Sequence, residues 1–451
     1  MRLPEGATHG TDDQARVVLA LGARRFAIGP LLRGTTAALR ALAAGFVDAE
    51  DLAGRAGDDE AAAQLRHVVG RLAARGWLER AVVLDGVRLA TLRPVGTPVA
   101  GPAAALGAGR PVALSRFAAA HRSGASLVLT SPRSSWSVGV DDPRVGSLVA
   151  RLAAPAAPDD PLGLPPGAAA AVLALLDDAG LLVAEPAGAG SGAEDGDQAL
   201  AQWSRTDLAF HAATRYGRQD GGYGGTFPLA GRFLPLPEHA EPAGPFVALA
   251  RPGPAAGEPS FDAVLDARCS IREHDNRSPI TVAQLGDFLY RAAGVRPATG
   301  TRPYPSGGGL YELELYPAVG RCDGLEAGLY RYDAVEHRLA AVADGPAVRR
   351  LLDDARRRCL MARTPQVLVV VAARFGRVMY KYEAIAYATI LKNVGALYQT
   401  MYCVATAMGL APCALGGGSA DAFCEAAGTD YLVESSVGEF LVGSRPQGCG
   451  R

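Results

Sequence analysis

The sequence predicts a mixed α+β chain, in which two tandem winged-helix modules precede a domain with a central sheet between helical layers. Helical patterns that end in a hairpin signal occupy the first hundred residues, and a similar pattern follows them. Beyond residue 240, helical periodicity alternates with short apolar runs typical of strands. We therefore expect four segments: module 1 at 1–100, module 2 at 110–186, a linker and arm at 187–240, and the largest domain at 241–451.

Composition narrows the class of protein. The chain has 451 residues, 49% of them apolar, and a formal net charge of −1. This balance gives no reason to expect nucleic acid or an anionic membrane as a partner. The N-terminal stretch MRLPEGATHGTDDQARVV lacks the apolar region of a signal peptide, and the seven cysteines form no CxxC pair. We therefore expect reduced thiols and a cytoplasmic protein.

Module 1 is predicted from helical spacing followed by a turn. The stretch TTAALRALAAG and the apolar positions from Leu65 to Leu72 both have helical spacing, and Gly76 ends the second pattern. Asp85-Gly86 then separates two apolar runs, which is a tight hairpin signal.

Module 2 is predicted from an internal repeat. RRFAIGPLL near Phe26 matches SSWSVGVDD near Trp136, and LAARGWL at Leu72 matches LDDAGLL at Leu176, with offsets of about 104 to 110 residues. Neither module carries a basic recognition helix, so we expect them to bind a peptide or a protein partner rather than DNA.

The segment from 187 to 240 is predicted to be a flexible linker, AGAGSGAEDGDQ, followed by an arm with aromatic residues among glycines. The arm is expected to wrap over another surface. His211 and Arg215 in it could touch substrate, and a packed, solvated arm is the alternative.

The largest domain is predicted to alternate helices and strands. Ser260 is a plausible helix cap, and Thr281 with Gln284 has capping-box spacing. LYELELYPAV alternates like a half-buried strand, whereas QVLVVVAAR reads as a central strand buried on both faces. The stretch from Arg377 to Leu410 reads as one long helix, buried rather than membrane-spanning.

Two groups of residues suit an anionic or flat ligand. Arg268, Ser270 and Arg272 place two guanidiniums and a hydroxyl within five residues, which favours phosphate binding. The glycine-rich stretches permit close approach of backbone amides to a ligand. The alternatives are surface arginines and plain glycine turns. The glycine-rich candidates are Pro305, Ser306, Gly307 and Gly308 in the first stretch, and Gly416, Gly417 and Gly418 in the second; Arg445 completes the set.

Lys381 and Tyr382 are the candidate acid–base pair. A lysine buried beside an apolar helix should lose a proton more easily, and a tyrosine offers a second such group. The alternative is a structural lysine that pairs with Glu383 or extends to solvent. The scattered histidines form no metal-binding pattern, so we expect no metal.

Residues 260–445 resemble the nitroreductase superfamily and, more closely, the SagB/McbC-type FMN-dependent dehydrogenases. The resemblance rests on an ordered set of stretches: RCSIREH, YPSGGGLYELELYP, GLYRYDAVEHRL, YKYEAIAYATILKNVGALYQTMYCVATAMGL and GGGSADAF. Longer members of this family also carry winged-helix modules beside precursor-peptide binding.

The resemblance implies a nitroreductase-like FMN fold and an activity. Such enzymes oxidise thiazolines or oxazolines in a ribosomally made peptide to thiazoles or oxazoles, with FMN as electron acceptor and oxygen to regenerate it. It implies that Lys381 and Tyr382 are catalytic, and that Arg268, Ser270, Arg272 and the loop from Pro305 to Gly308 bind FMN. Cys269 and Gly309 depart from the usual family residues without removing a needed group.

The resemblance also implies partners, namely an azoline-containing precursor peptide, a second copy in a homodimer, and a cyclodehydratase complex. Two other functions stay open. One is an NAD(P)H-dependent nitroreductase-like oxidoreductase of small molecules, and the other is a non-catalytic scaffold of a biosynthetic complex.

Overall fold

The computed structural model contains both helices and strands throughout, so the predicted α+β class is confirmed. The chain forms two compact units, unit 1 (Met1–Gly221) and unit 2 (Gly222–Arg451). Residues 187–193 of the predicted linker lie outside the residues that the structure describes. The structure describes residues 1–14, 16–21, 24–96, 110–157, 160, 162–184, 194–219, 221–239, 243–253 and 257–447.

Unit 1 begins with strands, although the sequence analysis placed helices first. Strand β2 pairs antiparallel with both β1 and β3. Leu19 and Phe26 are buried on this sheet and share a core with Leu39 and Leu72 of the helices that follow. The strands are short and interrupted, which is why their alternation is weak in the sequence. The elements are β1 (Thr8–Thr11), β2 (Val17–Leu21), β3 (Arg24–Gly29), α1 (Arg33–Ala44), α2 (Ala49–Gly54), α3 (Asp59–Ala74), β4 (Arg80–Leu84) and β5 (Val87–Pro94).

The β4–β5 hairpin joins the second half of unit 1. The predicted turn is present, since Asp85 and Gly86 have φ values of 52° and 75°. However, β5 also pairs with β9, with Leu92 opposite Val138, in a five-stranded sheet of order β4-β5-β9-β8-β7. The winged-helix assignment of both modules stays a prediction. The remaining elements are β6 (Val112–Leu114), β7 (Ala119–Ser123), β8 (Ser126–Thr130), β9 (Trp136–Val140), α4 (Pro143–Arg151), α5 (Pro166–Asp178), β10 (Leu182–Ala184), α6 (Gln198–Ala201) and α7 (Arg205–Ala213).

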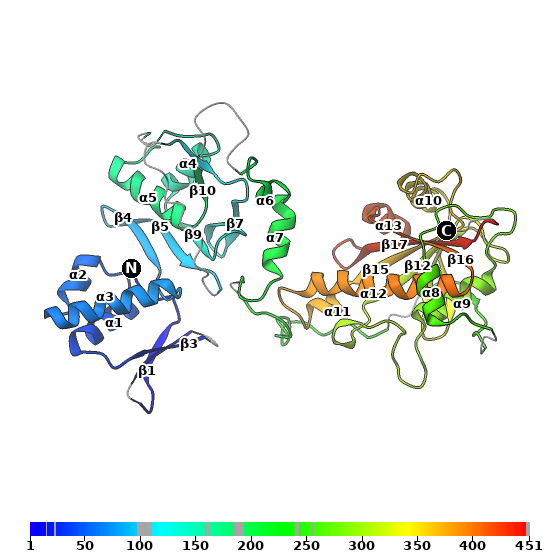
Figure 1. Ribbon diagram of the computed structural model, residues 1–451, viewed down its shortest axis with the longest axis horizontal. Helices are drawn as coiled ribbons and strands as arrows, with labels where there is room; N and C mark the ends of the chain where they lie inside the picture. The colour runs from blue at the N-terminus through cyan, green and yellow to red at the C-terminus, as the bar shows by residue number, and fades with distance from the viewer. Residues whose placement is uncertain are drawn as a thin grey trace. The chain divides into compact units, whose positions relative to one another are not determined.

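Unit 2 is built on a seven-stranded sheet of order β11-β14-β13-β12-β15-β17-β16, in which each described pairing is antiparallel. Figure 1 labels β12, β15, β16 and β17 of this sheet. Its elements are β11 (Phe246–Ala248), α8 (Phe261–Ala267), α9 (Val282–Ala293), the 3₁₀ turn η1 (Gly307–Gly309), β12 (Leu313–Val319), β13 (Gly328–Asp333), β14 (Arg338–Ala343), α10 (Pro346–Arg358), β15 (Val367–Arg374), α11 (Phe375–Met379), α12 (Ala386–Ala407), β16 (Leu410–Leu415), α13 (Ala420–Ala427) and β17 (Glu434–Ser444).

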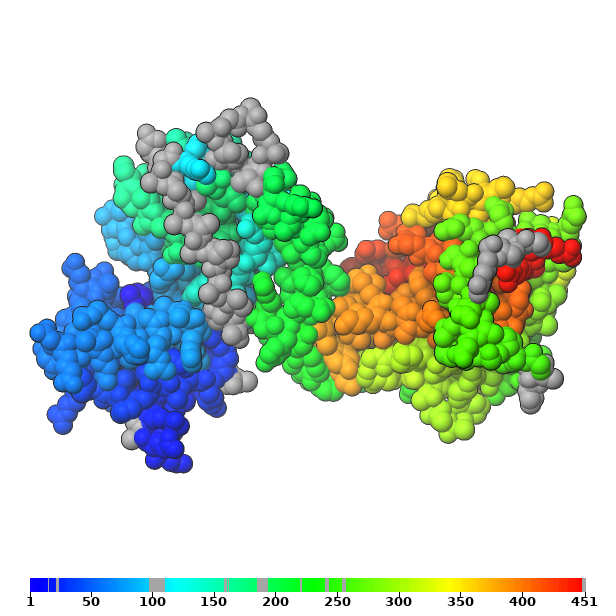
Figure 2. All heavy atoms as spheres, in the orientation of Figure 1, coloured from blue at the N-terminus to red at the C-terminus, as the bar shows by residue number. Residues whose placement is uncertain are grey.

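Helices cover both faces of this sheet. On β15, Val367 and Val369 face the core formed with α9 and α12, whereas Leu368 and Val370 face the core formed with α10 and α13. Figure 2 shows the yellow surface of α10 along the upper edge of unit 2 and the orange surface of α12 below it. The prediction that QVLVVVAAR is a central strand buried on both faces is therefore confirmed.

LYELELYPAV does contain a strand, β12, but the prediction that this strand is half-buried is wrong, because every residue of β12 is buried. β12 lies next to β15 in the middle of the sheet, so both of its faces are covered. Its apparent polar positions are paired charges: the Glu314 carboxylate lies 3.4 Å from Arg331 and 3.7 Å from Arg374. Buried charges are tolerated when they are paired in this way.

The predicted helix caps of unit 2 are confirmed. Ser260 accepts a hydrogen bond from the Ala263 amide, and Thr281 with Gln284 forms a capping box. Within the described ranges, no helix combines the length and apolar character that crossing a membrane requires.

Candidate functional site

Lys381 and Tyr382 lie in a break between α11 and α12. The prediction of one continuous helix from Arg377 to Leu410 is wrong, because six residues between these two helices are not α-helical. Ala384 has a φ of 63°, a left-handed conformation that ends helical hydrogen bonding. The break releases both side chains from helical register, so they need not point away from each other as successive helical residues do.

A glycine turn faces this pair. Gly308, in the centre of η1, has a φ of +68°. A Cβ atom at Gly308 would lie 2.5 Å from the Tyr382 Oη and 2.9 Å from the Lys381 Nζ. The Lys381 Nζ also lies 5.3 Å from the centre of the Tyr382 ring. The structure thus brings the two predicted catalytic residues and the predicted glycine turn together, and any side chain at position 308 would require both residues to move.

Lys381 forms no ion pair with a carboxylate in the described part of the chain. Glu383, the partner considered as the structural alternative, accepts a hydrogen bond from the Thr226 hydroxyl at 2.9 Å instead. Lys381 is half-buried, and its ammonium group is therefore held by the protein without being neutralised by it.

A buried polar network supports the glycine turn from behind. Asn393 on α12 accepts a hydrogen bond from the Gly307 amide at 3.0 Å and donates one to the Glu312 carboxylate at 2.8 Å. Ser306 donates to the other carboxylate oxygen of Glu312 at 3.2 Å. Glu312 is fully buried and Asn393 nearly so. Because buried polar groups must find partners, this network fixes the position of the turn.

The predicted phosphate-binding residues follow α8. The Ser270 and Tyr402 hydroxyls lie 2.7 Å apart, and the Arg268 guanidinium lies 5.4 Å from the centre of the Tyr402 ring. Tyr402 also accepts a hydrogen bond from the Ala414 amide of β16. Ser270 and Arg272 are exposed and Arg268 is half-buried, so two guanidiniums and a hydroxyl remain accessible to an anion.

The second glycine cluster lies where β16 ends and α13 begins. A Cβ at Gly418 would collide with the carboxylate of Glu439, which is 3% exposed. Burial raises the pKa of the Glu439 carboxyl to about 7, whereas the charge of Arg358 acts in the opposite direction. Arg358 also approaches the Gly417 carbonyl, at 3.4 Å. A carboxyl and a guanidinium therefore hold this loop.

The candidate residues form two groups along α12. Lys381, Tyr382 and the turn from Ser306 to Gly308 lie near Asn393, whereas the phosphate-binding set and the second glycine cluster lie near Tyr402 and β16. Nine residues of helix correspond to about 13.5 Å of rise. Pro305 is exposed just before the turn, and Arg445 directly follows β17.

Sequence reasoning missed the residues that support these groups. Glu312 and Asn393 were detectable as polar residues inside otherwise apolar stretches, ELELY and ILKNVGAL. Glu439 had the same signal within GEFLVG. Asn393 and Glu312 are 81 residues apart in sequence, and Arg358 precedes Glu439 by 81 residues, so these roles could not be read locally. Among the described residues, no group of three or more side chains is arranged to hold a metal ion.

Unit 1 contains a cavity of its own, of about 370 Å³, beside α7. Trp203 and His211 meet there with ring centres 5.5 Å apart. Arg215 and Arg218 also line it, and neither pairs with a carboxylate among the described residues. The predicted contact residues His211 and Arg215 therefore share a pocket that combines aromatic surface with positive charge.

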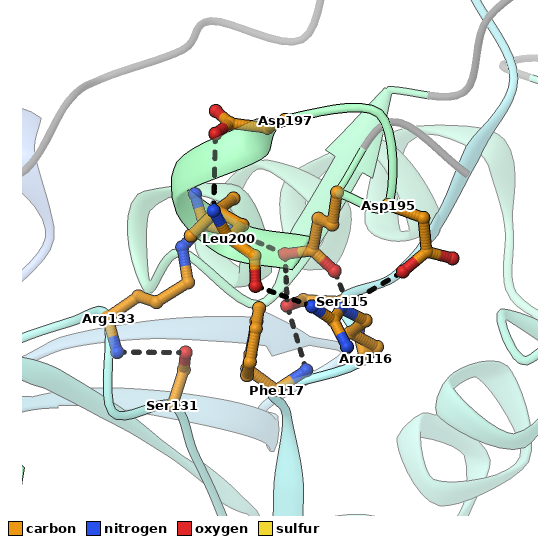
Figure 3. Close-up of polar contacts among 9 residues, drawn as sticks. Ser115, Arg116, Phe117, Ser131, Arg133, Asp195, Asp197 and Leu200 are labelled. Carbon is orange, nitrogen blue, oxygen red and sulfur yellow. Dashed lines mark hydrogen bonds and ion pairs between the residues drawn. The ribbon is translucent and has the colours of Figure 1, made fainter. Parts of the chain in front are cut away.

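A buried carboxylate fixes one wall of this pocket. Glu194, 6% exposed, accepts hydrogen bonds from the Ser115 hydroxyl at 2.7 Å and the Arg116 amide at 2.8 Å, and it pairs with Arg133. Figure 3 shows Arg116 reaching the Leu200 carbonyl, which its guanidinium contacts at 2.7 Å. Arg133 is thereby neutralised, which leaves the charge of the pocket to the arginines that follow α7.

Two family models match the chain. The model described as the nitroreductase family matches residues 265–444, and the model described as cyanobactin oxidase ThcOx matches residues 112–220. A Methanocaldococcus jannaschii protein named as a nitroreductase is 31% identical over 163 residues, which are 36% of this chain and 81% of the relative. The chain belongs to the nitroreductase family, and the nitroreductase-like fold predicted for its C-terminal half is confirmed.

The particular combination is a nitroreductase domain preceded by a segment that matches a cyanobactin oxidase model, which agrees with the predicted resemblance to SagB/McbC-type enzymes. The similar solved structures include the following two. The Escherichia coli microcin synthetase McbBCD complex, with truncated pro-MccB17 bound, is 21% identical and covers 49% of this chain and 91% of its own, with a TM-score of 0.36. A Bacteroides fragilis nitroreductase with bound FMN is 16% identical; the match covers 43% of this chain and 92% of the nitroreductase, with a TM-score of 0.28.

Proposed function

We propose that this protein oxidises thiazolines or oxazolines of a ribosomally made precursor peptide to thiazoles or oxazoles, with FMN as cofactor and oxygen as terminal acceptor. The observation that carries the proposal is the meeting of Lys381, Tyr382 and Gly308 in unit 2. Its support from comparison is the cyanobactin oxidase match at residues 112–220, beside the nitroreductase match.

The donors present fit FMN. Arg268, Ser270 and Arg272 offer two guanidiniums and a hydroxyl to a phosphate group. At Gly308 the absent side chain lets Lys381 and Tyr382 approach the backbone, and Gly416 has open space where a side chain would lie, so its backbone is accessible to a ligand. When bound, FMN supplies the redox chemistry, which no side chain of this protein can supply.

Lys381 and Tyr382 would handle the proton. Conversion of an azoline to an azole removes a proton from the ring carbon that was the α-carbon of the cyclised residue. A positioned base accelerates this loss. One residue of the pair would accept the proton, while the other orients it or stabilises the developing charge. Gly308 keeps both groups at one end of the site, and the buried network of Asn393 and Glu312 keeps Gly308 in place.

Three partners follow from the proposed activity. The precursor peptide would bind unit 1, where the pocket at Trp203 and Arg215 suits a segment with an apolar and an acidic side chain. A cyclodehydratase would supply the azoline, because that ring must form before it is oxidised. A second copy would complete the cofactor site, because the enzymes that this chain resembles are homodimers with FMN at the subunit interface.

Replacing Lys381 tests the proposal. Lys381→Ala should keep its yellow colour and bound FMN but lose about 100-fold or more in azole formation, as expected when an acid–base group is removed. Lys392→Ala is the matched control, because Lys392 is the other lysine of the chain and is exposed on α12. Azole formation is measured as the loss of 2 Da per ring by mass spectrometry. Equal rates in the two variants would remove Lys381 from the mechanism.

The purified wild-type protein also distinguishes a peptide azoline dehydrogenase from a small-molecule reductase. A nitroreductase-like enzyme should have its flavin bleached rapidly by NADPH, whereas a peptide azoline dehydrogenase should be bleached by azoline peptide. A colourless protein that does not take up added FMN would instead indicate a non-catalytic scaffold.

A further inference from the structure

A short segment of unit 2 lies directly against the candidate catalytic pair. Residues 222–227, which we call the strap, precede the sheet by more than 15 residues in sequence. A Cβ at Gly225, within the strap, would lie 3.9 Å from the Tyr382 ring and 4.0 Å from the Lys381 Cε. A side chain at position 225 would therefore touch both side chains of the pair.

The strap also supplies the backbone partners of the helix break. The Gly224 amide donates to the Glu383 carbonyl at 3.2 Å, and the Glu383 amide donates to the Gly224 carbonyl at 2.9 Å. The Phe227 amide donates to the Lys381 carbonyl at 3.1 Å. The Lys381 and Tyr382 amides donate to the Val378 carbonyl at 3.1 and 2.9 Å, and the three bonds to the strap satisfy the Lys381 carbonyl and both backbone groups of Glu383.

One side-chain contact of the strap decides the charge environment of Lys381. The Thr226 hydroxyl donates to the Glu383 carboxylate at 2.9 Å, and that carboxylate also lies against Gly222, where a Cβ would collide with it. Glu383 is two residues from Lys381, and opposite charges at this spacing in non-helical chain can pair. They do not pair here, because the carboxylate is turned toward the strap.

We propose that the strap is a positioning element of the catalytic site, in which Thr226 holds the Glu383 carboxylate away from the Lys381 ammonium. The inference rests on the proposed role of Lys381. Without the Thr226 hydroxyl, Glu383 turns to Lys381 and forms an ion pair. That pair draws the amine away from the glycine turn, so Lys381 works less well as an acid–base group.

Amine labelling tests the contact independently of turnover. Lys381 and Lys392 are the two lysines of the chain, so acylation by acetic anhydride, read by peptide mass spectrometry, compares Lys381 with an internal reference. Thr226→Val removes the hydroxyl at nearly constant volume, and residue 226 is exposed, so folding is expected to persist. Labelling of Lys381 relative to Lys392 should fall roughly two- to fivefold in Thr226→Val, the change that an exposed ion pair produces.

Two further variants separate the proposed role from a general loosening of the strap. Thr226→Ser keeps a hydroxyl and should label like the wild type. Thr226→Val combined with Glu383→Gln has no carboxylate to capture Lys381, so wild-type labelling should return, and with it the azole-forming kcat lost in Thr226→Val. Unchanged labelling in Thr226→Val, or a double variant that remains as slow to label as Thr226→Val, would overturn the proposal. If labelling behaves as expected while no variant forms azoles, the strap assignment holds and the proposed function fails.

Discussion

Gly308 and Gly309 are adjacent residues with the same backbone conformation but different surroundings. Both have a φ of +68°, so replacement by alanine costs each roughly 1 kcal/mol of backbone strain. A Cβ at Gly308 would meet Lys381 and Tyr382, whereas a Cβ at Gly309 would meet nothing within 4 Å. Comparison of alanine variants at these two glycines therefore separates the effect of backbone strain from the effect of a side chain that displaces Lys381 and Tyr382.

We predict that Gly308→Ala and Gly309→Ala destabilise the protein similarly but differ in activity. Gly308→Ala should lose about 100-fold in azole formation because it displaces both catalytic groups, since displacements of about 1 Å cost that much. Gly309→Ala should stay within a few-fold of the wild type. Urea unfolding and single-turnover flavin reduction measure the two effects. Equal activity in both variants would contradict the close approach seen at Gly308.

The buried carboxyl of Glu439 should make stability depend on pH. Burial raises its pKa from 4.5 to about 7, so the folded protein holds this proton at higher pH than the unfolded chain does. The free energy of unfolding therefore falls as pH rises from about 4.5 to about 7 and is level above that range. At about 1.4 kcal/mol per pKa unit, the fall is on the order of 3 kcal/mol.

We predict that Glu439→Gln removes this fall, because glutamine has no proton to lose and can still accept the Ser419 amide. The variant should gain stability over the wild type at pH 8 but not at pH 4.5, measured by urea unfolding at each pH. Burial lowers the pKa of His274 to about 4, which gives the opposite slope at acidic pH. His274 is present in both proteins, so its contribution cancels in the difference. A constant difference across the range would contradict the assignment.

At the scale of elements, α12 links the sheet to the glycine turn through one side chain. We predict that Asn393→Ala destabilises the protein by about 2–3 kcal/mol, because one oxygen of the buried Glu312 carboxylate and the Gly307 amide each lose the Asn393 hydrogen bond. Azole formation should fall with it, since the turn loses its anchor. Gln399→Ala, at an exposed position of the same helix, should change the free energy of unfolding by less than about 0.5 kcal/mol.

Elements defined by local chemistry were predictable from the sequence, and those defined by distant partners were not. The caps at Ser260 and Thr281 depend on residues three positions away, so their signal is complete within one stretch. The break at Ala384 depends on the strap, more than 150 residues earlier in the chain, and nothing in YKYEAIAY marks it. The buried Glu314 looked exposed because its partner Arg374 follows it by 60 residues.

At the scale of the whole molecule, exposed apolar side chains on unit 2 support the proposed homodimer. Three consecutive residues, Tyr431, Leu432 and Val433, are 56%, 79% and 54% exposed. Large apolar side chains that gather on a surface commonly mark an interface. We predict that sedimentation gives about twice the 46.5 kDa mass of one chain.

Leu432→Asp should shift this mass toward the monomer and weaken FMN binding, because it places a charge in the proposed interface. Val83→Asp, at an exposed position of unit 1, is the control and should leave the mass unchanged. A protein that sediments as a monomer while it binds FMN fully would contradict the dimeric site.

Much of the candidate site was visible in the sequence because its residues cluster in short motifs, such as Lys381 with Tyr382. One global signal went unused: only two of the 45 basic residues are lysine, so a lysine at position 381 does not reflect background composition. What composition and motifs cannot give is the grouping of Arg268 and Ser270 with Tyr402, because that grouping depends on where α12 crosses the sheet.

The pairing of β5 with β9 has a consequence for engineering hybrid proteins. Exchange of module 1 alone for that of a relative would cut a ladder in which Leu92 lies opposite Val138, and would leave two sheet edges to find new neighbours. Specificity grafts should therefore transfer residues 1–184 as one cassette. Swaps at residue 100 should yield insoluble chimeras even when both donor sequences fold well in their own context.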